Sequence, residues 1–181
     1  MPTGYFLETE RLRFRPLTYD DRADVAALLK DEESMRRMHF HPTDGIIAAW
    51  LVRAVQRNES RGFSHWHVSR KEDGRFAGII GVVHELVDGA EYTGLGYLIS
   101  PEFRRLGYAL EGAQACIGWA FANIDTEQVI AEIAADNLPS IHLAERLGMS
   151  FVREYLRPPG PEGVPHLLYS ISRETYEERS V

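Results

Sequence analysis

"PEFRRLGYALEGAQACIGWAF", residues 101–121, decides the fold, because an extended segment gives way to a helix inside it. Apolar residues in this stretch recur at the spacing of one helical face: Leu106, Leu110, Ala113, Ile117, Ala120 and Phe121. The first N–H groups of a helix have no partner inside it and carry partial positive charge, so they suit an anion, most often a phosphate. Arg104 and Arg105 stand before Gly107 and add positive charge. The sequence therefore predicts an anion-binding turn here.

Length and charge bound the class of protein. The chain has 181 residues, of which 44% are hydrophobic, so it can bury an ordinary core and we expect a single domain over residues 1–181. The formal net charge of −7 argues against a nucleic-acid partner, because nucleic-acid binders usually carry a basic face. An acidic surface favours cationic or amine partners instead.

The cysteine content and the lengths of the apolar runs indicate the cellular compartment of the protein. Cys116 is the only cysteine and lies inside the expected helix, so we expect no disulfide, a core thiol rather than a nucleophile, and a reducing compartment. No apolar run approaches the roughly 20 residues of a membrane span, and residues 1–17 lack the apolar core of a signal peptide. We therefore expect a soluble cytoplasmic protein with no membrane partner.

Periodicity predicts an α+β fold with about seven strands and about four helices. Extended patterns indicate strands at 10–17, 64–70, 76–87, 91–100 and 128–135, and on both sides of the Pro- and Gly-rich segment 157–165. Helical patterns lie at 18–34, with a capping box at Thr18 and Asp21, at 46–58, from Leu106 onward, and at 138–147. We expect an antiparallel meander from 64 to 100, a parallel pairing across the helix from Leu106, and an exposed hairpin loop at 157–165.

The turn resembles a motif of a known family. Arg104-Arg105-Leu106-Gly107-Tyr108-Ala109 matches the Arg/Gln-x-x-Gly-x-Gly/Ala turn of the GNAT superfamily of N-acetyltransferases, whose backbone N–H groups hold the pyrophosphate of acetyl-CoA. "ETERLRFRPLTYDD" and "LGYLISPEF" resemble the family's first strand and helix start and its fourth strand. "DNLPSIHLAERLGMSFV" is similar to a segment of the ribosomal-protein N-terminal acetyltransferase branch. The resemblance covers about the whole chain and implies a mixed, mostly antiparallel sheet, splayed at the acetyl-CoA site.

The resemblance also assigns contacts to acetyl-CoA, the cosubstrate. Besides the six turn residues, it implies that the pantetheine arm pairs with the backbone of Leu98 and Ile99 and lies near Asn137 and Ser140. A strand with glycines at 94 and 96 is weak unless something passes close to its backbone, so these glycines would give clearance to the arm. A freed N–H on this strand would donate to the thioester oxygen.

Transfer to an amine requires a neutral nitrogen, so a base or a water chain must take a proton from an amine whose pKa lies near 10.4 in lysine. Many relatives carry a glutamate at the position of Thr93 or Gly94, and its absence here leaves the base unassigned. Glu91 shares the strand face of Thr93 and is the candidate that we name, with His84 and Glu85 as alternatives. Each of the three would otherwise be a solvated charge.

The thiolate that leaves requires a proton. Many GNAT enzymes place a tyrosine seven residues after the motif asparagine, but Ala144 stands there. In the ribosomal-protein-like branch the serine three residues after the asparagine has this role, so the resemblance assigns it to Ser140. Asn137 could cap its helix, bind pantetheine, or do both, and Ser140 could only bond locally.

The pairs His39-x-His41 and His65-x-His67 raise the question of a metal. No third ligand with regular spacing accompanies them, so we expect no metal. In the family the acceptor enters beside the first two helices. The resemblance therefore implies that these two histidine segments line the acceptor pocket.

Two functions remain open. The first is an acetyl-CoA-dependent N-acetyltransferase acting on a primary amine, either a protein or peptide N-terminus or a small amine. It would work by direct attack in a ternary complex, because no cysteine lies at the expected site. The alternative is a weak or inactive acetyl-CoA-binding sensor or interaction domain, suggested by the missing strand glutamate and motif tyrosine. Either would be a monomer or a homodimer.

Overall fold

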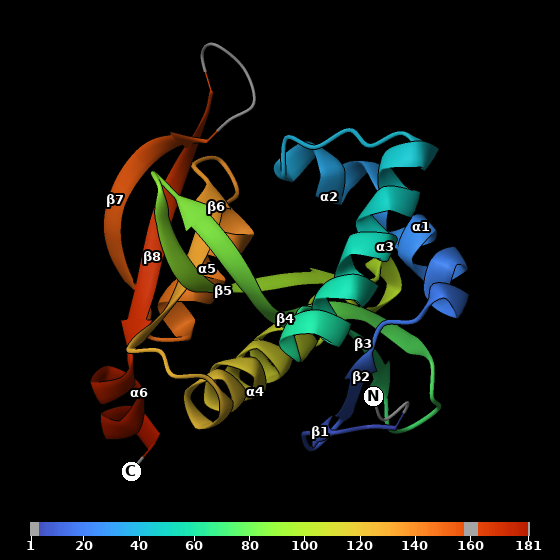
Figure 1. The fold of residues 1–181 in the computed structure, drawn as a ribbon, viewed down its shortest axis with the longest axis horizontal. Helices are drawn as coiled ribbons and strands as arrows, with labels where there is room; N and C mark the ends of the chain where they lie inside the picture. Colours follow the sequence, from blue (N-terminus) through green and yellow to red (C-terminus); the bar gives the residue numbers. More distant parts are fainter. Residues whose placement is uncertain (1–3, 158–162, 181) are drawn as a thin grey trace.

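The computed structural model describes residues 4–157 and 163–180. In this part of the chain, eight strands form one mostly antiparallel sheet with the order β1-β2-β3-β4-β5-β6-β8-β7 (Figure 1). Their bounds are β1 Leu7–Glu8, β2 Leu12–Pro16, β3 His65–Arg70, β4 Phe76–Val87, β5 Ala90–Ile99, β6 Gln128–Ala134, β7 Ser150–Arg157 and β8 Val164–Ser172. Most of the hairpin loop expected at 157–165 lies outside the described residues.

Helices cover both faces of the sheet, which confirms the α+β class. They are α1 Arg22–Leu29, α2 Glu32–Arg37, α3 Asp44–Arg61, α4 Tyr108–Asn123, α5 Leu138–Arg146 and α6 Arg173–Ser180, with 3₁₀ turns η1 Tyr19–Asp21 and η2 Pro101–Phe103. Helix α4 packs on one face of β4 and β5. Helices α1 and α3 pack together on the opposite face of β4 (Figure 1).

Strands β3, β4 and β5 form the antiparallel meander that the sequence predicts. Strand β5 then pairs in parallel with β6, as expected across α4, but only at Thr93↔Val129 and Gly94↔Ile130. Beyond these pairs the two strands part (Figure 1). The backbone of Leu98 and Ile99 therefore has a strand partner on the β4 side alone. The predicted splay is present.

Three elements exceed the prediction. Helix α2 has six residues and buries only Met35, so it shows no clear helical period. Helix α6 is strongly polar, and its Tyr176 packs on Phe121 with ring centroids 5.3 Å apart. Strand β1 has two residues. Short elements of this kind form through tertiary contacts rather than through local pattern.

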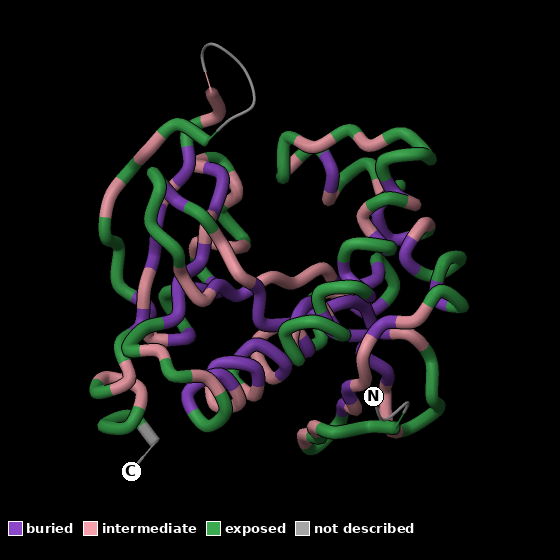
Figure 2. The backbone as a smooth tube through the Cα atoms, viewed as in Figure 1, coloured by how far each residue is buried: buried purple, intermediate pink, exposed green. Residues whose placement is uncertain are grey.

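Two large apolar clusters occupy the two faces of the sheet, and the buried backbone in Figure 2 follows the central strands and the inner side of α4. Cys116 lies in the α4 cluster with no exposed area, and burial raises the pKa of its thiol. It is a core residue, as predicted. No helix in the described ranges is long and apolar enough to cross a membrane.

Candidate active site

The turn before α4 has the backbone that an anion site requires. Gly107 is the N-cap residue and has φ +86°, a left-handed conformation that favours glycine. The first helical hydrogen bond runs from the N–H of Glu111 to the Gly107 carbonyl, at 3.1 Å. The N–H groups of residues 108–110 therefore have no acceptor within the helix and face the start of the turn.

A partly exposed network fixes this turn from the segment between β1 and β2. Arg11 Nη1 donates to the carbonyl of Leu106 at 2.9 Å, and Arg11 Nε donates to the Glu111 carboxylate at 2.6 Å. The Thr9 hydroxyl donates to the same carboxylate at 2.5 Å. Partial burial tends to raise the pKa of Glu111, but the bonds from Thr9 and Arg11 outweigh it and hold the pKa below its usual value.

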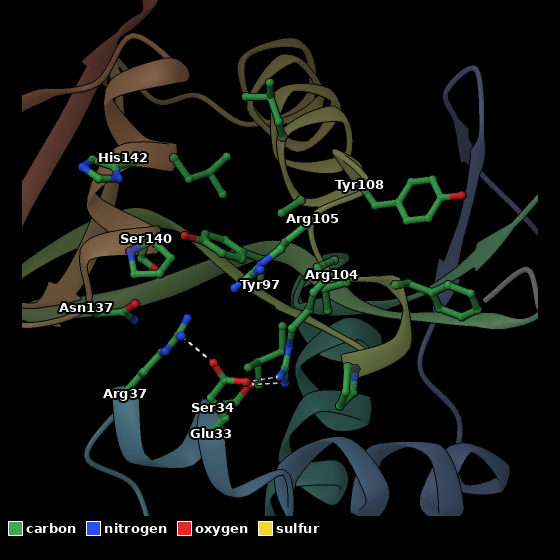
Figure 3. A pocket seen from close by; sticks show the side chains of 18 of the residues that line it. Glu33, Ser34, Arg37, Tyr97, Arg104, Arg105, Tyr108, Asn137, Ser140 and His142 are labelled. Atoms are coloured by element: carbon green, nitrogen blue, oxygen red, sulfur yellow. Dashed lines mark hydrogen bonds and ion pairs between the residues drawn. The ribbon is translucent and has the colours of Figure 1, made fainter.

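The structure separates the two arginines that the sequence treated alike. Arg104 donates to Glu33 at 2.9 Å and to the Ser34 hydroxyl at 2.8 Å, and it forms an ion pair with Asp31. It therefore ties the turn to α2, and its contact with a phosphate, implied by the resemblance, remains a prediction. Arg105 has φ +62°, lines the cavity in Figure 3, and pairs with no carboxylate among the residues that the structure describes. The Arg105 guanidinium is therefore available to bind an anion.

A cavity of about 790 Å³ runs from this turn past the splayed end of β5 to α2 and α5 (Figure 3). Leu98 and Ile99 line it, as do Asn137 and Ser140. Of the residues predicted to contact acetyl-CoA, only Leu106 does not line this cavity.

A second cavity, of about 410 Å³, lies between the sheet and α3. It meets the first at the splayed end of β5. The residues that line both cavities are Met38, Tyr97, Leu98, Asn137 and Ser140. A group that reaches this junction through the first cavity would face a molecule held in the second.

Tyr97 supplies a hydroxyl at the junction. Its oxygen is buried and has no hydrogen-bond partner among the described residues. Burial raises the pKa of Tyr97 to about 12, and the neighbouring Ser140 hydroxyl only partly opposes the rise. Tyr97 is thus a protonated donor at neutral pH. The sequence analysis looked for a tyrosine on the helix at position 144 and missed this one on β5.

The side chains of Asn137 and Ser140 also face the junction (Figure 3). Asn137 is the N-cap residue of α5, yet its side chain makes no capping hydrogen bond. Its carbonyl accepts the N–H of Ser140 at 3.0 Å. The Asn137 side chain therefore does not cap the helix, and its binding to a ligand remains a prediction.

Gly94 and Gly96 of β5 make room for different neighbours from the one that we expected. A Cβ at Gly94 would lie 2.7 Å from Cγ of Glu85, and a Cβ at Gly96 would lie 2.5 Å from Nε2 of His65. The glycines make room for side chains of β4 and β3, not for a pantetheine arm. They allow Glu85 and His65 to lie over β5 on the side of the second cavity.

Glu85 and Glu132 form a carboxylate pair in the second cavity. The Glu132 side chain is only 7% exposed, and its Oε2 accepts the Tyr155 hydroxyl and lies 3.9 Å from Nε of Arg157. Burial raises the pKa of Glu132 to about 7, Arg157 opposes the rise, and Glu85 adds to it. Glu132 is therefore partly protonated near neutral pH. The sequence analysis missed Glu132.

The structure does not bring Glu91 to either cavity. It lies opposite Leu86 at the hairpin end of β5, about 20 Å along the strand from Tyr97. Its side chain is 75% exposed and pairs with His84 at 3.3 Å.

The histidines of β3 have separate surroundings. His65 lines the second cavity, and burial lowers its pKa to about 4, so it is neutral. His67 lies 3.9 Å from Asp21 and 3.8 Å from Asp24, the one group of three possible metal ligands among the described residues. Arg15 already donates twice to Asp21, at 2.6 and 2.8 Å, which disfavours a cation. The absence of a metal remains a prediction.

This geometry defines a class of protein. A turn that offers free N–H groups to a phosphate leads into a gap between splayed strands, where a second cavity meets it. This is the arrangement of an acetyltransferase that takes its acetyl group from a coenzyme A thioester. A family model described as "Acetyltransferase (GNAT) domain" matches residues 11–150, and the chain belongs to this family.

Individual relatives agree with this assignment. The FsC-acetyl coenzyme A-N(2)-transacetylase of Aspergillus fumigatus is 29% identical, over 94% of this chain and 77% of its own length. The Vibrio cholerae spermidine N-acetyltransferase, solved with CoA and spermine, has a TM-score of 0.75 at 14% identity, covering 93% of this chain and 99% of its own. A ribosomal-protein-S5-alanine acetyltransferase from Vibrio fischeri has a TM-score of 0.72 at 16% identity, covering 96% of this chain and 98% of its own. The two solved structures share the fold.

Proposed function

We propose that the protein is an acetyl-CoA-dependent N-acetyltransferase that moves an acetyl group to a primary amine by direct attack. The observation that carries this proposal is the meeting of two cavities at Tyr97 and Ser140. Acetyl-CoA would lie in the first cavity, with the thioester at the junction, and the amine would arrive through the second. The names of the transacetylase and spermidine relatives support a nitrogen acceptor.

Backbone groups would hold most of the cosubstrate. The free N–H groups of residues 108–110 and the unpaired Arg105 suit the pyrophosphate. The unpaired backbone edge of Leu98 and Ile99 suits the amides of the pantetheine arm, and the Asn137 amide can bond the same arm.

Glu132 is the base in this proposal, with Glu85 as its partner. A pKa of about 7 leaves a sizeable ionised fraction at neutral pH, where a general base is most effective. Glu85 stands over Gly94, one of the two positions where relatives carry their strand glutamate. A neighbouring strand thus supplies a carboxylate that β5 lacks.

Residues that line the two cavities can supply and accept the protons of this reaction. The amine nitrogen bonds to the thioester carbonyl carbon while the carbon–sulfur bond breaks. Glu132 accepts the proton from the nitrogen, and Tyr97 donates a proton to the departing sulfur, with Ser140 beside it. No acetylated protein residue is required.

The alternative of an inactive acetyl-CoA sensor rested on a missing glutamate and a missing tyrosine. Glu85 and Tyr97 offer these groups from other positions, so the observation that favoured the sensor no longer does so. We also propose that residues 1–181 act as one domain.

Turnover tests the proposed function. Acetyl-CoA should release free thiol when an amine is added, with the acetylated amine seen by mass spectrometry and the protein mass unchanged by acetyl-CoA alone. The panel should span α-amines, benzylamines, amino acids and polyamines. Binding of acetyl-CoA without transfer to any of these amines would favour the sensor, and a mass gain on the protein would contradict direct attack.

Tyr97→Phe should lower kcat by about 10- to 1,000-fold with little change in acetyl-CoA affinity, because it removes a proton donor and little contact area. The variant should unfold at the same or a higher temperature, since an unpartnered buried hydroxyl costs about 1–3 kcal/mol. Ser140→Ala is the matched comparison and should have a smaller effect. An active Tyr97→Phe enzyme of reduced stability would mean that the hydroxyl is structural.

A further inference from the structure

The second cavity has more cationic than anionic groups along its walls. Among the residues that the structure describes, Arg53, Arg57 and Arg157 line it, and Glu85 and Glu132 are the only carboxylates in its lining. Three guanidinium groups outnumber two carboxylates, and the pKa of Glu132, raised by burial to about 7, reduces the negative charge further near pH 7. The cavity therefore carries net positive charge in a chain whose formal net charge is −7.

Two of these arginines have no acidic partner. Arg53 and Arg57 lie one turn apart on α3, on the face that also carries Trp50, and both line the cavity. Within the described ranges, no carboxylate lies at ion-pair distance from either. The positive charge of Arg57 adds to burial in lowering the pKa of His65, so its field reaches the inner wall. Unpaired guanidinium groups in a cavity suit a carboxylate or a phosphate.

Aromatic rings also line this cavity. The rings of Trp50 and His65 lie 5.0 Å apart, and Phe40 lines the same cavity. His65 is neutral, so it adds no charge to this wall. The cavity volume of about 410 Å³ is in the range of sites for small molecules.

We propose that the acceptor is a small amino compound that also carries a carboxylate or phosphate group. Arg53 and Arg57 bind the anionic group, while Glu132 and Glu85 face the amine. This inference rests on the proposed function, since it takes the second cavity as the acceptor site. A polyamine has no anionic group for the two guanidiniums and meets their repulsion, so local charge opposes the polyamine preference that net charge alone suggests.

The test compares three benzylamines that differ in their para substituent, two of them anionic there, with a polyamine. The probes are 4-(aminomethyl)benzoate, 4-(aminomethyl)phenylphosphonate, 4-methylbenzylamine and spermidine. Binding to the CoA-loaded protein is measured by calorimetry, and kcat/KM is measured with acetyl-CoA. We expect the two anionic amines to bind and react at least about 10-fold better than 4-methylbenzylamine, and spermidine to be the poorest. Comparing the two anionic probes distinguishes carboxylate from phosphate recognition.

The variant Arg53→Gln/Arg57→Gln should remove this preference: binding of the two anionic amines should fall about 10-fold, and binding of the cationic 4-methylbenzylamine should not fall, because the variant removes positive charge that repels it. Arg61→Gln is the matched control, because Arg61 is an exposed arginine in the last turn of the same helix and lines neither cavity. It should keep the preference. Higher salt should also weaken binding of the anionic amines more than that of 4-methylbenzylamine, which has no anionic group for the two guanidiniums.

The outcomes separate this inference from the proposed function. A binding preference for the anionic amines without transfer supports the inference and contradicts the proposed function. Transfer to 4-methylbenzylamine or spermidine as fast as to the anionic amines supports the function and overturns the inference. No measurable preference in binding, or an equal loss for all probes in the double variant, also overturns it.

Discussion

Glu132→Gln should lower kcat/KM for acetyl transfer by about 100- to 10,000-fold at pH 7, because it removes the base while keeping the shape of the side chain. In the unchanged protein the rate should rise with pH through about 7, as Glu132 loses its proton. In the variant that rise should disappear. Its rate should follow deprotonation of the free amine instead and so favour amines of low pKa. Steady-state rates between pH 5.5 and 9 check this.

Glu91→Gln is the matched control, because it makes the same change at the glutamate that the sequence analysis named. Glu91 lies at the far end of β5 and lines neither cavity, so the variant should retain nearly full activity. A large loss in Glu91→Gln with little change in Glu132→Gln would reverse our assignment of the base.

Stability shows whether the Glu132→Gln protein is intact. The native pKa of Glu132 is about 7, above its ordinary 4.5, so between these values the folded protein holds a proton that the unfolded chain has lost. The free energy of unfolding contributed by Glu132 therefore falls as pH rises through this window, by up to about 3 kcal/mol. Glutamine carries no charge, so the variant should melt at a higher temperature than the unchanged protein at pH 8. The difference should shrink towards pH 4.5.

Local pattern predicted those parts of the fold in which sequence neighbours interact. The capping box at Thr18 and Asp21 is formed, and Gly62 and Gly148 end their helices with positive φ. Helix α2 escaped prediction because its place depends on Arg104, some 70 residues later, which bonds to its first turn. A contact of that span leaves no local pattern in a six-residue helix.

The same distinction separates the two halves of the site. The phosphate turn was predictable because its residues are contiguous, from 104 to 109. The proposed base, Glu132, was not, because β6 meets β5 only across α4, at Thr93↔Val129 and Gly94↔Ile130. Its partner Glu85 was named only as an alternative, because the register that sets Val83 opposite Gly94 is what brings it to the site. Two features of the sequence nevertheless indicated the position of this carboxylate pair. Two glycines on one strand face indicate that neighbouring side chains cover it, and Glu132 is a lone acid within the apolar strand "VIAEIA".

Gly107→Val should abolish the stabilisation of the protein by acetyl-CoA. At about 100 times its dissociation constant, a ligand adds roughly 2.7 kcal/mol to the folded state, which for a chain of this size raises the melting temperature by about 5–10 °C. Valine at φ +86° is strained, and a Cβ there would lie 3.2 Å from Nη2 of Arg11. The turn must shift, and its free N–H groups then no longer point towards one phosphate site. Affinity should fall at least about 100-fold.

Gly89→Val is the control that separates backbone strain from loss of the site. Gly89 lies at the hairpin between β4 and β5 with φ +83°, close to that of Gly107, and nothing lies within 4 Å of a Cβ placed there. Both substitutions should therefore lower the melting temperature of the ligand-free protein by similar amounts, through similar strain. Only Gly107→Val should remove the further rise with acetyl-CoA, followed by thermal melting and by calorimetry. If Gly107→Val keeps that rise, the phosphates do not bind at this turn, since the N–H groups of residues 108–110 depend on the Gly107 conformation for their direction.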